Sequence, residues 1–211
     1  MNWNKQIQTA WQQELAKGNY DTVGVLKFNR GTAIGHTTAE TLYESYWHKL
    51  DKVMFGSEAE KGVCVERWCF MERGKYGDNT HMHFVARAPF DTTLFCAVAS
   101  ALWVNFHRYT SAYGYSWITP IQCNDASSAY ITKETWWLRD DMTGLKCSRP
   151  NSADKNYTKF DTPKQASRIL NHIGIEELVR ATEAVDRHIT KTTERRQLKQ
   201  RLSKARSKQQ A

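Results

Sequence analysis

The sequence predicts an α+β fold in which helices pack on one side of a central, mainly antiparallel β-sheet. Strand-like runs rich in β-branched residues alternate with runs whose apolar residues recur every three or four positions, as in helices. Two strand-like runs, residues 62–72 and 80–88, are separated by a short turn rich in Gly, Asp and Asn, which is typical of a hairpin. The order strand, helix, strand, strand, helix, strand, helix favours an α+β sandwich.

The elements before the hairpin follow from local signals. A first amphipathic helix ends near Gly18, and residues 21–28 form a strand that runs into a turn. Thr37 and Glu40 have the spacing of a capping box. They predict the start of a second helix, which continues to about Met54 along an apolar stripe.

The elements after the hairpin are two helices and a strand. Asp91 caps a strongly apolar helix, which we expect to lie on the sheet. A strand over residues 115–122 follows and contains a proline, so it belongs at an edge or a bulge. Asp125 or Ser127 then caps a helix over residues 126–138.

The chain divides into three parts, and its charge is unevenly placed. Residues 1–140 form the main domain, residues 141–162 a polar loop or linker, and residues 163–211 a helical extension. The formal net charge is +8, and residues 187–211 account for all of it with nine basic side chains and one carboxylate. Such a tail is typical of attraction to phosphate or to an acidic surface, although a solvated helix end has the same composition.

The cysteines and the hydropathy limit the class of protein. Five cysteines, an odd number without a Cys-x-x-Cys pair, indicate neither a disulfide framework nor a zinc ribbon. A reducing cytoplasm is the simpler environment. No signal-peptide pattern and no membrane-spanning apolar run occur in the sequence, so we expect a cytoplasmic protein without membrane contact.

The hairpin carries a candidate metal site. His81 and His83 point to the same face of their strand because side chains alternate with a period of two. Glu72 ends the facing strand and can reach the same patch. Two imidazoles and one carboxylate suit a divalent cation with open positions. A solvated or carboxylate-paired histidine pair is the alternative.

A second candidate group is Tyr130 with Lys133, three positions apart and so on one helix face. A tyrosine beside a lysine can act as a nucleophile while the ammonium group offsets charge on a phosphate. The same spacing occurs at Tyr46 and Lys49, where the surrounding apolar residues favour packing.

The order of these parts resembles the HUH endonucleases of the rolling-circle replication initiator (Rep) class, single-tyrosine type. The strand over residues 21–28, the run Glu72-Arg73-Gly74 before His81-Met82-His83, and the helix with Tyr130-Ile131-Thr132-Lys133 match its three motifs in order. The resemblance covers residues 21–140 and implies an HUH nuclease domain there. It also implies a five-stranded antiparallel sheet of split βαβ, RRM-like type flanked by helices.

The resemblance implies a mechanism and a substrate. His81, His83 and Glu72 would hold Mn²⁺ or Mg²⁺, and the cation would polarise a phosphate of single-stranded DNA at a replication origin. Tyr130 would attack, leaving a 5′-phosphotyrosine and a free 3′-OH, and Lys133 would position the phosphate or offset its charge. No P-loop motif occurs in the sequence, so a separate helicase is expected. A plasmid or phage in a bacterial or archaeal host is the expected source.

Further residues are candidates for DNA contact at strand ends, around the hairpin turn and after the tyrosine helix. They are Asn29, Arg30, Arg73, Lys75, Trp136 and Trp137. Core packing is an equal alternative for each tryptophan.

Other functions stay open on the sequence alone. A relaxase would place its tyrosine before the histidine pair, at Tyr46, and a single-tyrosine transposase would share the chemistry of the Rep class. A noncatalytic RRM-like nucleic-acid-binding module would need no metal. An RNA-processing metallohydrolase would need the metal but not Tyr130.

Overall fold

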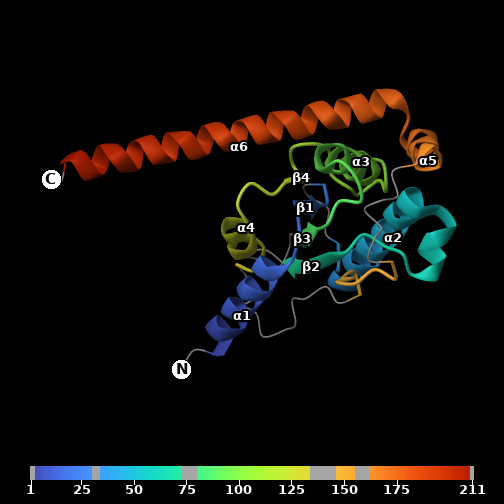
Figure 1. The fold of residues 1–211 in the computed structure, drawn as a ribbon, viewed down its shortest axis with the longest axis horizontal. Coiled ribbons are helices and arrows are strands. Elements are labelled where there is room, and N and C mark those ends of the chain that lie inside the picture. Colours follow the sequence, from blue (N-terminus) through green and yellow to red (C-terminus); the bar gives the residue numbers. More distant parts are fainter. Residues whose placement is uncertain (1–2, 30–33, 73–79, 134–145, 155–161, 210–211) are drawn as a thin grey trace.

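A four-stranded antiparallel sheet with the order β2-β3-β1-β4 forms the centre of the molecule (Figure 1). The computed structural model describes residues 3–29, 34–72, 80–133, 146–154 and 162–209. The strands are β1 (Thr22–Lys27), β2 (Arg67–Glu72), β3 (His81–Ala86) and β4 (Trp117–Pro120). The α+β class and the antiparallel sheet are confirmed. The fifth strand that the resemblance implies is not among the strands of the described residues.

Helices cover both faces of the sheet, so the prediction of helices on one side was wrong. On one face, α2 (His36–Phe55) and α3 (Thr92–Val104) enclose the main core. On the other face, α1 (Trp3–Lys17) and α4 (Asn124–Ile131) pack over a smaller apolar cluster. The amphipathic stripe of α1 buries Leu15 in this second cluster, which separates the helices into two layers.

Close packing on the main-core face requires a glycine in β1. A Cβ atom at Gly24 would lie 2.5 Å from ring atoms of Phe84 in the neighbouring strand. Any side chain there would push the ring away or bend the sheet. The small residue therefore lets the aromatic ring of Phe84 fill the core above β1.

The helix starts show where local signals determined the fold. Asp91 caps α3 as expected, because its Oδ1 accepts a hydrogen bond from the Leu94 backbone N–H at 2.8 Å. The capping box at Thr37 and Glu40 is wrong in detail, since α2 starts at His36 without a side-chain cap and Glu40 pairs with Lys146 instead. The helix therefore starts two residues before the expected position, with Gly35 as its N-cap.

The helix that carries the tyrosine motif is shorter and earlier than expected. It begins at Asn124, and its N-cap is Cys123, which makes no side-chain cap hydrogen bond, so the expected N-cap positions Asp125 and Ser127 are wrong. It ends at Ile131, and the rest of the expected range after Lys133 lies outside the described residues. Tyr130 is therefore in the last helical turn and Lys133 in the turn that follows it.

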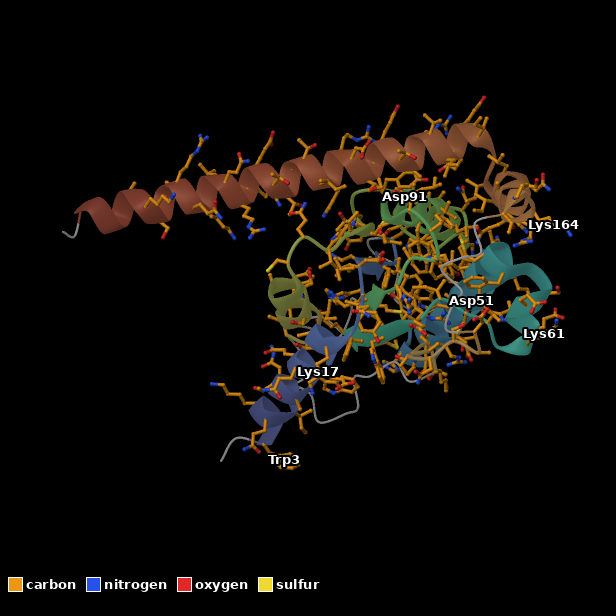
Figure 2. All side chains as sticks on the ribbon, viewed as in Figure 1. Trp3, Lys17, Asp51, Lys61, Asp91 and Lys164 are labelled. Carbon is orange, nitrogen blue, oxygen red and sulfur yellow. The ribbon has the colours of Figure 1, made fainter. Side chains whose placement is uncertain are left out.

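A buried ion pair joins α2 to the start of β2. The Arg67 guanidinium donates to both carboxylate oxygens of Asp51, at 3.0 and 3.1 Å, and lies over the ring of Trp47. Figure 2 shows Asp51 among the packed side chains of the domain. The Arg67 backbone also exchanges two hydrogen bonds with Arg149, so residues 146–154 cover the outer edge of β2.

The C-terminal extension consists of α5 (Pro163–Ile173) and α6 (Ile175–Gln209). Thr162 caps α5, and Gly174 separates the two helices. The first part of α6 packs on α3 and β4, where Ala181 and Val185 are buried. The helix then continues past α4, with side chains that project from the folded body (Figures 1 and 2). Within the described residues, no helix has the length and apolarity to cross a membrane.

Candidate functional site

Three side chains meet on the sheet face that α1 and α4 cover. Glu72 of β2 lies directly opposite His81 of β3, and His83 follows two residues later on the same face. The Glu72 Oε2 atom lies 2.8 Å from His81 Nε2 and 3.0 Å from His83 Nε2. One possible ligand atom from each of the three residues lies within 4.8 Å of the other two. The hairpin register thus gathers the three residues that the sequence proposed.

The polar atoms of this cluster are buried and incompletely satisfied. Glu72 and His83 are at most 1% exposed, and His81 is 7% exposed. Both carboxylate oxygens of Glu72 and both ring nitrogens of His83 lack a hydrogen-bond partner among the described residues. Although the Nε2 atoms are close to Oε2, the His83 contact does not have hydrogen-bond alignment. Such burial is costly unless another group satisfies the atoms.

A divalent cation is a group that fits. Carboxylate oxygen and imidazole nitrogen form a donor set used by Mn²⁺, Fe²⁺ and Zn²⁺, and three protein ligands leave positions for substrate or water. The buried Glu72–His81–His83 group can therefore bind a metal ion. We call these three residues the metal centre.

The protonation states of the metal centre suit cation binding. Burial raises the pKa of the Glu72 carboxyl, but the adjacent imidazoles of His81 and His83 outweigh burial and hold that pKa well below its usual range. Burial lowers the pKa of His83 to about 4, although the Glu72 carboxylate opposes the effect. Near neutral pH, Glu72 is therefore ionised and His83 is neutral, which are the forms that bind metals.

Tyr130 and Lys133 lie beside the metal centre. The Tyr130 ring packs edge-on against His83 with centroids 5.0 Å apart. Lys133 Nζ lies 3.2 Å from Glu72 Oε2 and 4.6 Å from the centre of the Tyr130 ring. Tyr130 is 40% exposed, so its side chain is accessible to a large substrate. A partly exposed phenol side chain, an ammonium group and the metal centre thus lie in one patch.

Helix α1 fixes the end of α4 that carries this pair. Gln8 of α1 donates a hydrogen bond from Nε2 to the Thr132 carbonyl oxygen at 2.9 Å, and Ile131 is buried in the second apolar cluster. The Thr132 hydroxyl donates back to the Ser128 carbonyl at 2.7 Å. The residues on either side of Tyr130 and Lys133 are therefore held by packing and hydrogen bonds.

The remaining sequence candidates are placed differently. Asn29 follows the end of β1 that pairs with His81, and its side chain donates to the Arg108 carbonyl oxygen at 3.2 Å. The residues Arg30, Arg73, Lys75, Trp136 and Trp137 lie outside the described residues. Tyr46 is fully buried, and its hydroxyl donates to the Ala99 carbonyl oxygen at 2.9 Å. The core packing expected for Tyr46 is confirmed.

Two aromatic residues next to Tyr130 were not expected from the sequence. Trp117 of β4 lies 6.1 Å from Tyr130 between ring centroids, and it stacks on His188 of α6 at 4.7 Å. The alternation of side chains along residues 115–122 predicts the face of the sheet on which Trp117 lies, but only once β4 is known to pair with β1. No local signal could place His188, because its position depends on how α6 packs on the sheet.

Comparison with known proteins does not assign the chain to a class. No family model matches it, and neither the curated proteins nor the solved structures contain a significant match. The chain is an α+β protein with a buried group that can hold a metal ion.

Proposed function

We propose that this protein is a metal-dependent endonuclease that nicks single-stranded DNA and becomes covalently attached to it, as a rolling-circle replication initiator of the HUH class does. The observation that supports the proposal is the contact of Tyr130 and Lys133 with the metal centre. A nucleophile, a cation and a metal site are the parts that attack on a phosphodiester requires.

The residues have separate roles in the proposed reaction. Glu72, His81 and His83 would hold Mn²⁺ or Mg²⁺, which when bound supplies Lewis-acid polarisation of the scissile phosphate. The Tyr130 oxygen forms a bond to phosphorus as the bond to the 3′ oxygen breaks. The tyrosine proton is released and the departing 3′ oxygen takes up a proton. Lys133 offsets the negative charge on the phosphate as it passes through the transition state.

The proposed product retains a phosphodiester, so the reaction is reversible. The 5′ phosphate is esterified to Tyr130 in place of the 3′ oxygen, and a free 3′-OH can attack it to rejoin strands. That outcome suits the start of DNA synthesis at an origin, with a separate helicase to open the template. A plasmid- or phage-encoded initiator would carry this out in the host cytoplasm.

A covalent-adduct experiment tests the proposal. The protein is incubated with Mn²⁺ and a diverse pool of single-stranded oligonucleotides labelled at either the 5′ or the 3′ end. A denaturation-resistant protein band should carry only the 3′ label, while the 5′-labelled fragment should be extendable by a polymerase. EDTA and Tyr130→Phe should both abolish the band, and Tyr46→Phe should retain it.

Other outcomes of this experiment would overturn the proposal. Binding without any adduct would indicate the noncatalytic RRM-like module. Cleavage that survives Tyr130→Phe would indicate metal-activated water, as in an RNA-processing hydrolase. An adduct lost only in Tyr46→Phe would indicate a relaxase.

A further inference from the structure

A groove of about 690 Å³ opens between β4, α4 and the basic part of α6. Tyr130 is one of its lining residues, so the groove reaches the residue that also contacts the metal centre. The residues that give it a chemical character are Trp117, Tyr130, His188, Arg195, Arg196 and Lys199. The groove therefore combines elements that are far apart in the sequence.

The α6 wall of the groove is positively charged. Arg195, Arg196 and Lys199 lie within little more than one helical turn, and none of the described residues lining the groove carries a carboxylate. Arg195 and Lys199 lie ~6 Å apart along the helix axis, so they can contact different phosphates. Burial lowers the pKa of His188, and the nearby positive charge of Arg195 lowers it further. His188 is thus a neutral ring within a positive field.

Aromatic rings form the floor of the groove. The rings of Trp117 and His188 are nearly parallel, with 17° between their planes, and Tyr130 is adjacent to Trp117. Neighbouring Val23 and Pro120 add apolar surface. A basic wall above aromatic and apolar surface is the combination that binds single strands, because cations contact the phosphates and flat rings stack with bases.

We propose that this groove holds the segment of single-stranded DNA that leads to Tyr130, and that α6 is the wall that binds its phosphates. The proposal rests on the proposed function for the identity of the strand. A groove of about 690 Å³ has room for a short segment of one strand. Three of the nine basic residues in 187–211 then have a specific role, on the face of α6 that contacts the substrate.

The test compares two variants of equal charge on the same helix. The groove variant is R195Q/R196Q/K199Q, and the control variant is R187Q/K191Q/R201Q, whose residues do not line the groove. All six side chains are exposed, so both variants should fold, which circular dichroism checks. Binding of a fluorescent oligonucleotide is measured by anisotropy in EDTA over a series of salt concentrations.

The groove variant should bind at least about tenfold more weakly, with a salt slope reduced by about 2 because three phosphate contacts are lost. The control variant should lose clearly less affinity. Equal losses in the two variants would overturn the proposal, because general attraction to a basic helix would then suffice. Unchanged binding in the groove variant would also overturn it.

Adduct formation in Mn²⁺ separates this inference from the proposed function. The groove variant should form less adduct at low DNA concentration and approach the native amount at saturation. If no protein forms an adduct while the EDTA binding difference persists, the nuclease proposal fails and the groove remains a binding site. If adducts form equally in both variants at low DNA concentration, the groove proposal fails and the nuclease proposal stands.

Discussion

The phenol ring of Tyr130 stands edge-on against the imidazole of His83, with the ring planes inclined by 70°. This contact joins the last turn of α4 to the central part of β3. It places the ring of the proposed nucleophile beside a metal ligand without any substrate. Preorganisation of this kind reduces the entropy lost when the reacting groups meet.

Metal binding should stabilise the protein. At a Mn²⁺ concentration about 100 times the dissociation constant, the added stability is ~2.7 kcal/mol, which raises the melting temperature by roughly 5–10 °C. Glu72→Gln should remove this increase, because the substitution takes away the charged ligand. Glu40→Gln, at a surface ion pair with Lys146, should retain it. Differential scanning fluorimetry measures all three proteins, and a shift that persists in Glu72→Gln would argue against the metal centre.

Lys133 should affect the rate of cleavage more than metal affinity. Lys133→Gln removes the positive charge beside Tyr130 and should slow single-turnover adduct formation by about 100-fold. Lys133→Arg should recover part of the rate, because it keeps the charge. Lys146→Gln, which removes an exposed lysine paired with Glu40, is the matched control. Equal rates for the native and Lys133→Gln proteins would exclude Lys133 from the reaction.

The metal-free protein should lose stability in mild acid because of His83. Its folded pKa of about 4 lies below the ordinary value of 6.5, so the unfolded chain takes up the proton first. The contribution of His83 to the free energy of unfolding should therefore fall by about 2 kcal/mol between pH 7 and pH 5. Urea unfolding in EDTA measures this dependence. His83→Gln should flatten it, and an identical pH dependence in the variant would contradict the assignment.

The buried pair of Asp51 and Arg67 should be costly to break and cheaper to replace. Asp51→Ala leaves the guanidinium buried without its partner and should lower the free energy of unfolding by about 3–5 kcal/mol. Burial raises the pKa of Asp51, although the charge of Arg67 opposes the effect, so desolvation disfavours the charged pair. The double variant Asp51→Leu/Arg67→Met should therefore be more stable than Asp51→Ala. Urea unfolding of the three proteins gives the comparison.

The metal centre could be predicted from the sequence because its geometry is local. A hairpin with two-residue alternation is sufficient to bring His81, His83 and Glu72 together, and the structure bears out their proximity. Tyr130 and Lys133 were expected on one helix face. The structure places them together although the helix ends between them, because the turn after Ile131 brings the Lys133 backbone N–H to the Tyr130 carbonyl oxygen.

The nonlocal parts of the fold could not be predicted. Pairing of β1 with both β3 and β4 places Trp117 next to Tyr130, and nothing within residues 115–122 specifies that neighbour. The packing of α1 on the second face depends on an apolar surface that forms only when the sheet is assembled. The position of the groove depends in addition on the direction in which α6 leaves α5.

The hydrogen bond from Gln8 to the end of α4 links the first helix to the proposed nucleophile, although α1 contributes no residue to the proposed site. The metal ligands lie on β2 and β3, which pair with each other directly, whereas the end of α4 that follows the tyrosine is hydrogen-bonded to α1. A fusion tag or truncation that displaces α1 would thus leave the three metal ligands in place but would shift the hydroxyl of Tyr130. Metal binding and the proposed DNA cleavage would then become separable properties of the same chain.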